Sequence, residues 1–381
     1  MEVKLEGLPY TYHVLDGSIW SNEVDSGPLN QRGWVFQERH LARRVLYFGK
    51  TQMAWGCKEK RALEMFPTGI PSCSIQPDRE FDLMGNMTQA TSNITPLGLP
   101  GFVKDWQDLL EDYSTCEFSF PRDKLMALEG ISTQLAIARP GDSYFAGAWK
   151  STALFDLPWH RHQDDRDEYP ATDTSERAPS WSWACVDGAI QFPLAQEVFP
   201  RVRECYAQVK TLAGHSVTIG DNVRTVGSIQ MEASCLPLRL QLSEQNDIIG
   251  FYGPGFRFST TNGPLQSAIY LECADQVACL LSNAGKLLLI PLFSTVNFIY
   301  CIVVWKIRGV SEHRRVGAVN IALMELTDEE TRGTRDILQQ DIDHPLPGML
   351  PDNLSEKWNL PALRLVLSLK QKPLFRCVNI S

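Results

Sequence analysis

The sequence predicts an α+β protein, with an N-terminal, mostly helical part that contains a β-hairpin, followed by an antiparallel β-rich part of the sandwich or barrel-like kind. Two observations carry this prediction. Apolar residues recur at helical spacing between residues 102 and 139, and strand-like runs dominate from residue 205 onward. At 381 residues the chain is long enough for two or three domains with cores of their own.

The first expected elements are a short amphipathic helix and a hairpin. Asn30 follows a Gly-Pro turn and can accept hydrogen bonds from the first N–H groups of a helix that begins near Gln31. The runs 44–48 and 51–55 are rich in aromatic and branched residues, and the pair between them starts with glycine, which favours a hairpin. Residues 58–66 predict one more short helix, which ends at a Pro-Thr-Gly turn.

Three helices are expected in the next part of the chain. Apolar side chains share one face over residues 102–114, and a second helix starts near Pro121 and Asp123 and extends to about residue 139. Residues 144–157 predict the third helix. Together these helices would form a small helical layer.

The helical layer is expected to end in a tryptophan-rich strand at residues 178–186. Ser and Ala alternate there with Trp181, Trp183 and Cys185, and this period of two places both tryptophans on one face of a strand. A paired-tryptophan face is typical of packing against a core, and it can also serve as a platform for a ligand.

The second half of the chain predicts nine strands separated by turns, an arrangement typical of an antiparallel sandwich or barrel. The stretch 287–305 is apolar, but Pro291 and the polar Ser294, Thr295 and Asn297 interrupt it, so it predicts two buried strands and no membrane span. The predicted strands are 205–211, 216–219, 228–233, 236–242, 268–272, 278–281, 286–292, 299–307 and 315–321.

Composition divides the chain into five segments. Turn-forming residues without periodicity mark a flexible loop, and a Thr-x-x-Glu capping pattern marks a late helix. The segments are 1–69, a helix and a β-hairpin; 70–101, the flexible loop; 102–190, the helical layer; 200–325, the β-rich domain; and 326–381, a C-terminal helix and tail.

Charge and cysteine usage exclude several classes of protein. A net charge of −9 and the lack of long basic runs argue against a nucleic-acid partner. The ten cysteines include no Cys-x-x-Cys pair, and no secretory leader is predicted, so we expect reduced thiols and a cytoplasmic protein. His160 and His162 precede Asp164, Asp165 and Asp167, but solvated loop residues are the usual outcome for such a polar run. We therefore predict no metal site and no cofactor.

The most distinctive motifs lie between residues 28 and 57. They are Pro-Leu-Asn-x-Arg-Gly-Trp-x-x-Gln-Glu-Arg at 28–39, Arg-Val-Leu-x-Phe-Gly at 44–49 and Trp-x-Cys at 55–57. They resemble the closing segment of the fungal heterokaryon-incompatibility (HET) domain and the hairpin that follows it. Later motifs occur in the order found in HET-type proteins, so the resemblance covers residues 27–190. The later motifs are Trp106, Tyr113-Ser114, Asp123-Lys124-Leu125-x-Ala127-Leu128-x-Gly130-Ile131, Tyr144-x-Ala146-Gly147-x-Trp149 and Ala178-Pro179-Ser180-Trp181-Ser182-Trp183-Ala184.

The resemblance implies a role related to heterokaryon incompatibility and programmed cell death. Family members carry a long α/β core domain before the Arg-Gly-Trp segment, whereas 26 residues precede Gly27 in this chain. We therefore expect a truncated or divergent HET-type protein that lacks most of the name-giving domain.

Glu38 is the one carboxylate that the resemblance singles out. HET domains have been compared with the TIR fold, whose enzymatic members cleave NAD with a glutamate on a helix, and by that analogy Glu38 can stabilise an oxocarbenium-like state at the ribose. The alternative, which we favour, is that Glu38 pairs with Arg32, Arg39 or Arg43 and fixes the helix against the hairpin.

Three functions of different classes remain open. The first, which we favour, is a non-catalytic interaction or regulatory role toward a protein partner, because phosphate-loop, dinucleotide, zinc-protease and serine-hydrolase signatures are absent. The second is a NAD-cleaving hydrolase that uses Glu38. The third is a repurposed scaffold that binds or converts an apolar small molecule, as in secondary metabolism. Its candidate ligand-binding residues are Trp34, Trp55, Trp181 and Trp183.

Overall fold

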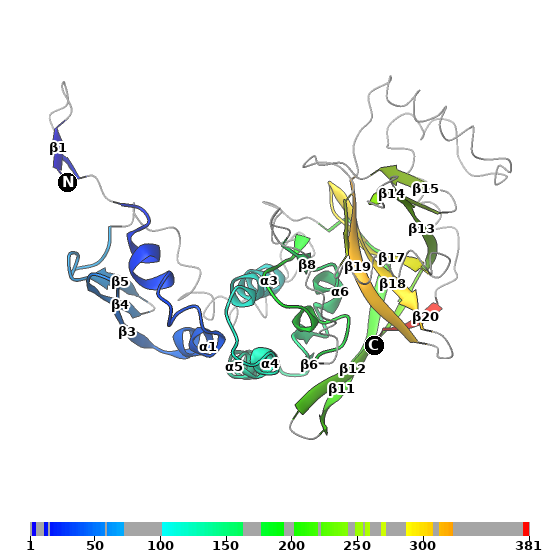
Figure 1. The fold of residues 1–381 in the computed structure, drawn as a ribbon, viewed down its shortest axis with the longest axis horizontal. Helices are drawn as coiled ribbons and strands as arrows, with labels where there is room; N and C mark the ends of the chain where they lie inside the picture. The colour runs from blue at the N-terminus through cyan, green and yellow to red at the C-terminus, as the bar shows by residue number, and fades with distance from the viewer. Residues whose placement is uncertain are drawn as a thin grey trace.

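The computed structural model has three groups of elements, with a helical layer between a small N-terminal sheet unit and a large sheet (Figure 1). The α+β class predicted from the sequence is confirmed. The structure describes residues 2–4, 11–13, 16–57, 59–71, 101–162, 177–193, 202–219, 222–242, 248–253, 256–259, 268–271, 287–307, 312–322 and 376–380.

The N-terminal unit is built on a three-stranded antiparallel sheet. The predicted hairpin is confirmed as β3 and β4. The helix predicted over residues 58–66 is wrong, because the chain turns back after Cys57 and pairs with β4, which buries Leu63 against Trp20 and Val24. The elements are β1 (Glu2–Lys4), β2 (Thr11–His13), the π-helical turn η1 (Ser21–Asp25), α1 (Gly33–Leu41), β3 (Arg44–Phe48), β4 (Met53–Cys57) and β5 (Lys60–Leu63).

Helix α1 begins two residues later than the sequence predicts. Asn30 does not cap the helix, because its side-chain amide donates a hydrogen bond to the carbonyl of Val24 at 2.6 Å. The backbone before the helix is extended and pairs with Glu117, whose carbonyl accepts a hydrogen bond from Gly33 N–H at 3.1 Å. A long-range contact therefore fixes where the helix starts.

Helix α3 (Gly101–Ser114) confirms the helix predicted at 102–114 and forms the centre of the helical layer. The second predicted helix is divided into α4 (Asp123–Met126) and α5 (Glu129–Ala138). In the described part of the chain, no helix combines the length and the apolar composition that a membrane span requires. The core of the layer includes Phe36, Phe102, Trp106, Leu109, Leu110, Tyr113, Leu128, Ile131, Leu135 and Trp149.

The helix predicted over residues 144–157 is wrong for most of its length. β6 (Tyr144–Phe145) and β7 (Ala148–Trp149) form a tight hairpin, and only α6 (Ala153–Asp156) is helical. The turn between the two strands has Ala146 at φ 48° and Gly147 at φ 86°. Two successive residues with left-handed backbone geometry are incompatible with a right-handed helix.

The strand predicted over residues 178–186 is also wrong. Ser182 Oγ accepts a hydrogen bond from Ala184 N–H at 3.1 Å and thereby starts the 3₁₀ helix η4 (Trp183–Cys185). The period of two is lost, so Trp181 packs toward the large sheet while Trp183 packs into the helical layer. The short strands β8 (His160–Arg161) and β9 (Ile190–Gln191) pair beside this segment.

The large sheet contains eleven of the described strands. Its main path is β11-β12-β20-β19-β18-β17-β13-β14-β15, with β10 beside β17 and β16 beside β19, and the path is open at β11 and β15. Strands β17 and β18 confirm the interpretation of residues 287–305 as two buried strands. The strands are β10 (Glu204–Cys205), β11 (Ala207–Ile219), β12 (Asn222–Ala233), β13 (Leu236–Leu242), β14 (Ile248–Gly253), β15 (Phe256–Ser259), β16 (Ala268–Leu271), β17 (Leu287–Ser294), β18 (Phe298–Lys306), β19 (Glu312–Ala322) and β20 (Arg376–Ile380).

The C-terminal residues contribute strand β20, which the sequence did not predict. β20 pairs antiparallel with β12 and parallel with β19, and it completes the sheet between them. Three other predicted elements lie outside the described residues. They are the loop at 70–101, apart from its ends, the strand at 278–281 and the helix that begins near residue 326.

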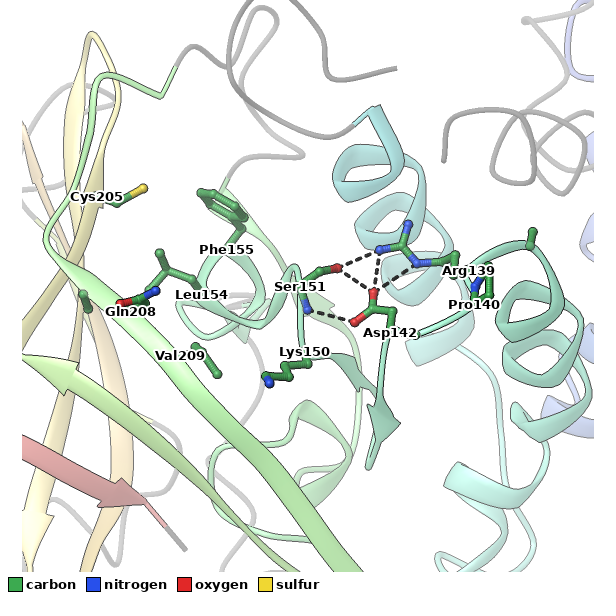
Figure 2. A pocket seen from close by; sticks show the side chains of 13 residues that line it. Arg139, Pro140, Asp142, Lys150, Ser151, Leu154, Phe155, Cys205, Gln208 and Val209 are labelled. Atoms are coloured by element: carbon green, nitrogen blue, oxygen red, sulfur yellow. Dashed lines mark hydrogen bonds and ion pairs between the residues drawn. The ribbon is translucent and has the colours of Figure 1, made fainter. Parts of the chain in front are cut away.

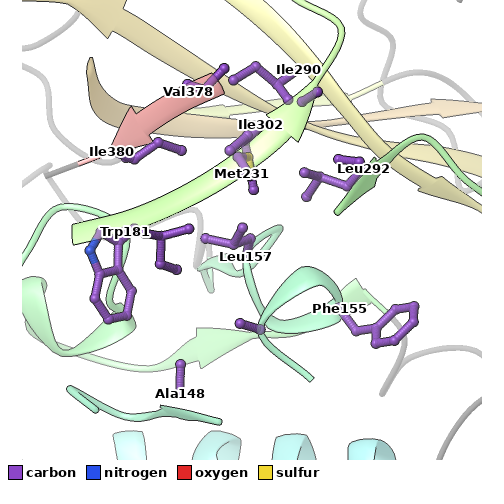
Figure 3. Close-up of a cluster of buried hydrophobic side chains, with 14 of the residues drawn as sticks. Ala148, Phe155, Leu157, Trp181, Met231, Ile290, Leu292, Ile302, Val378 and Ile380 are labelled. Atoms are coloured by element: carbon purple, nitrogen blue, oxygen red, sulfur yellow. The ribbon is translucent and has the colours of Figure 1, made fainter. Parts of the chain in front are cut away.

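The sheet and the helical layer share one apolar core (Figure 3). Leu157 and Trp181 extend from the layer toward Met231 and Ile302 of the sheet. Phe155 lies at the edge of the cluster, where its ring packs against Phe293 of β17 with 5.1 Å between the ring centres. Burial of each such side chain contributes about 1.5–3 kcal/mol to the free energy of unfolding. The remaining labelled members of this cluster are Ala148, Ile290, Leu292, Val378 and Ile380.

A buried arginine joins the same two parts by hydrogen bonds. Arg315 of β19 is completely buried, and its Nε donates to the carbonyl of Leu157 at 3.0 Å while Nη2 donates to the carbonyl of Trp159. Its backbone N–H donates to Ser180 Oγ at 3.0 Å, and its guanidinium lies 4.0 Å from the centre of the Trp159 ring. A buried charge is tolerated only when such groups satisfy it.

Replacing Arg315 with methionine is expected to destabilise the chain by about 3–5 kcal/mol, because the carbonyls that it bonds lose their buried donors. Chemical denaturation measures this loss. The matched control is Arg314→Met on the neighbouring, half-buried residue of β19. Equal losses in the two variants would show that the buried contacts do not hold the sheet to the layer.

Candidate functional site

Two of the predicted site residues lie on α1, which docks on the helical layer. The indole N–H of Trp34 donates to Asp123 Oδ2 at 3.1 Å, and the side-chain oxygen of Gln37 accepts a hydrogen bond from Gly130 N–H at 2.5 Å. Glu38 is exposed on the same helix. Arg39, one of the arginines expected to pair with Glu38, forms an ion pair with Asp25 at 2.9 Å.

Three further tryptophans proposed as ligand-binding residues lie in different surroundings. Trp181 and Trp183 are each only 2% exposed and belong to different core clusters. Trp55 is 38% exposed on β4 of the N-terminal sheet. The structure therefore does not assemble these side chains into one aromatic platform.

The predicted His/Asp cluster is only partly within the described residues. His160 is buried on β8, where its ring stacks on Tyr270 with 3.8 Å between the ring centres, and burial lowers the pKa of His160 to about 4. The three aspartates lie outside the described residues. Within the described ranges, His, Cys, Asp and Glu side chains form no group of three or more that could hold a metal ion.

A cavity of about 910 Å³ lies between the end of α5, α6 and strand β11 (Figure 2). Arg139 forms an ion pair with Asp142 at 2.7 Å, and Ser151 Oγ bonds both of these side chains. The Arg139 guanidinium also lies 3.8 Å from the centre of the Phe102 ring. These polar groups bond one another, and they join the two chain segments on either side of the β6–β7 hairpin.

The outward face of the N-terminal sheet exposes a patch of large apolar side chains. Leu46 and Phe48 of β3 lie directly opposite Trp55 and Met53 of β4. All four are exposed, and Phe48 is 81% exposed. We call these four residues the apolar face. Large apolar patches that remain exposed usually mark interaction sites.

The apolar face is slightly hollow and has a basic end. A cleft of about 340 Å³ runs over it, lined by Leu46, Trp55 and Ala62 among others. Arg44 and Lys60 are exposed, and the strand register places both beside Cys57 at one end of the same face. The other face of the sheet buries Tyr47 and Ala54 against η1, so only one face is available.

Asp156 and Lys124 are ionisable residues buried in the helical layer. Asp156 accepts hydrogen bonds from Gln107 Nε2 at 3.0 Å and Thr152 Oγ1 at 2.9 Å, and burial raises the pKa of Asp156 to about 7. Lys124 donates to the carbonyl of Val186 at 2.8 Å and lies 5.2 Å from the centre of the Trp183 ring. Burial lowers the pKa of Lys124 to about 7.

Sequence reasoning missed both the apolar face and the burial of Lys124. The period-two alternation in β3 and β4 contained the signal for the face, because Leu46 and Phe48 share one side of a strand while Val45 and Tyr47 share the other. No local signal predicted the burial of Lys124, since a lysine beside Asp123 is typical of an exposed first turn.

Comparison of the chain with models of protein families, with curated proteins and with solved structures finds no significant match.

Gly33→Ala is expected to lower the free energy of unfolding by about 1–3 kcal/mol, although alanine is the better helix former. A Cβ at Gly33 would lie 2.0 Å from the Phe118 ring, so the ring or the start of α1 must move. In a Phe118→Ala background the same change is expected to be neutral or stabilising. Denaturation of the wild-type chain, the two single variants and the double variant measures the coupling between positions 33 and 118. Additive effects of the two substitutions would contradict the close packing of Gly33 on Phe118.

The free energy of unfolding of the Asp156→Asn variant, relative to that of the wild-type chain, is expected to increase as the pH rises from about 4 to about 7. Because the folded state raises the pKa of Asp156 above its ordinary value of 3.8, it binds a proton that the unfolded chain has lost, and the wild-type chain loses stability across this window. The difference between the two proteins should grow by about 1 kcal/mol or more. Denaturation at pH 4 and pH 8 tests this, and an equal difference at both would contradict it.

Proposed function

We propose that this chain is a non-catalytic interaction protein of the HET type, with a role related to heterokaryon incompatibility and cell death. It binds a protein partner through the apolar face. The observation that carries the proposal is the exposure of four large apolar side chains on one side of a sheet whose other side is buried.

The residues that carry the family resemblance support the proposal because they contact one another. Trp34 and Gln37 of the first motif bond Asp123 and Gly130 of a later one, and Tyr113 OH donates to the carbonyl of Lys124 at 2.6 Å. These hydrogen bonds hold α1 against α4 and α5. They therefore help to fix the N-terminal unit, which carries the apolar face, relative to the helical layer.

The chemistry of the apolar face indicates the kind of partner. Leu46, Phe48, Met53 and Trp55 offer an apolar surface, and basic side chains lie at one end of it. The complementary partner is a protein segment with apolar side chains next to acidic ones. Glu38 is exposed, and it lines neither the cavity at Arg139 nor the cleft over the apolar face. These two hollows therefore add no support for NAD cleavage at Glu38.

A Phe48→Ser, Trp55→Ser double variant is expected to lose the function of the chain while the fold is retained, because both side chains are exposed. Inducible expression of the wild-type chain in a filamentous fungal host should arrest growth, and the double variant should not. Circular dichroism checks that the variant is folded.

The matched control is Ile137→Ser, which removes an apolar side chain that is 72% exposed on α5. This variant should arrest growth as the wild-type chain does. Strong expression of the wild-type chain with no growth defect and no co-purifying protein would overturn the proposed function. Full activity of the double variant would overturn the assignment of the apolar face.

A further inference from the structure

A further cavity, of about 310 Å³, lies within the helical layer where strands β11 and β12 pass over it. Helices α4 and α5 form one wall, and the β6–β7 hairpin forms another. Ser216 and Thr225, which pair across β11 and β12, line a further side, and Thr225 N–H donates to the carbonyl of Arg177 at 3.2 Å. Several segments far apart in the sequence therefore build this pocket.

Cationic side chains dominate the charge of the pocket. Lys124 and Arg177 line its interior with side chains that are at least nine-tenths buried, and the exposed Arg122 lies at its rim. Glu129 is the acidic side chain in the lining and is exposed. Asp187 balances part of the charge through an ion pair with Arg177 Nη1 at 2.6 Å. The lining as a whole favours an anion.

Arg177 and Lys124 have more hydrogen-bond donors than the described residues accept. Arg177 Nε donates to the carbonyl of Ala184 at 2.6 Å, but its buried Nη2 has no hydrogen-bond partner among the described residues. Lys124 uses one donor for Val186, although an ammonium group carries three. A buried guanidinium nitrogen without a partner is costly, and an anion in the pocket would remove this cost.

Another part of the lining is apolar, next to hydroxyl-bearing residues such as Ser132 and Thr133. Leu125, Met126, Ala136 and Phe145 form the walls beside the cationic groups. The cavity volume is at the lower end of the range found for small-molecule sites, which typically combine an apolar lining with a few convergent polar groups. A ligand that satisfies both features has a charged end and an apolar body.

We propose that this pocket binds a small organic anion, whose carboxylate or phosphate group meets Arg177 and Lys124 and whose apolar body packs against Leu125, Met126 and Phe145. This is a binding site separate from the apolar face, and it does not depend on the proposed partner interaction.

The test is isothermal titration calorimetry of the full chain with phenyl phosphate, benzoate, phenol and inorganic phosphate. We expect phenyl phosphate or benzoate to bind, and the tighter of the two identifies the anionic group. Phenol lacks the charge and inorganic phosphate lacks the apolar body, so each should bind at least about tenfold more weakly. The proposal fails if neither organic anion binds, or if phenol or inorganic phosphate binds as tightly as they do.

Two rim variants locate the site without disturbing buried groups. Arg122→Gln should weaken binding of the tighter anion by about two- to fivefold, and Glu129→Gln should strengthen it by a similar factor, which is the range for exposed charges. Lys150→Gln removes a positive charge at the cavity beside Arg139, and it should leave binding of the anion unchanged. Binding that is unchanged in both rim variants, or that responds equally to Lys150→Gln, would place the anion elsewhere and overturn the proposal.

Discussion

The fold depends on a guanidinium that has no access to water. Arg315 extends from the large sheet into the helical layer, where two main-chain carbonyls and the Trp159 ring surround its charge. Burial lowers the pKa of Arg315, which reflects the cost of removing this charge from solvent. The apolar cluster around Trp181 and Met231 supplies most of the driving force for packing, but it has little directional preference. The arginine fixes which carbonyls meet which strand, and thus sets the register between sheet and layer.

Helix α1 is held in the same way, with apolar packing as the driving force and hydrogen bonds that fix its position. Phe36 packs into the core of the helical layer, while Trp34 and Gln37 bond to particular groups of α4 and α5. Gly33 has no room for a side chain beside the Phe118 ring. The motif residues that appear most distinctive in the sequence are therefore explained by docking geometry, and none of these contacts requires catalysis.

The two surfaces proposed for binding arise from what this docking leaves unfilled. The N-terminal sheet is covered on one face only, so alternate side chains of β3 and β4 remain exposed. Beside the pocket at Lys124, Phe145 packs on Gly214 and Gly227, which face each other across β11 and β12. The β6–β7 hairpin can therefore approach these two strands closely, and Ser216 and Thr225 of the same strands border the pocket. The first site is an apolar surface of the kind that protein partners bind, and the second is a pocket lined by cationic side chains, which suits a small anion.

The sequence by itself determined the elements whose periodicity is long and regular. Helix α3, the β3–β4 hairpin and strands β17 and β18 follow from the spacing of apolar residues, and so does the α+β class. Tertiary contacts decided the short elements. The alternation at 178–186 indicated a strand, yet Ser182 bonds Ala184 and the carbonyl of Ala146, which turns the segment into a 3₁₀ helix and separates its tryptophans. The pocket around Lys124 was equally beyond sequence patterns, because its lining comes from segments that only the packed fold brings together, and local spacing holds no information about such contacts.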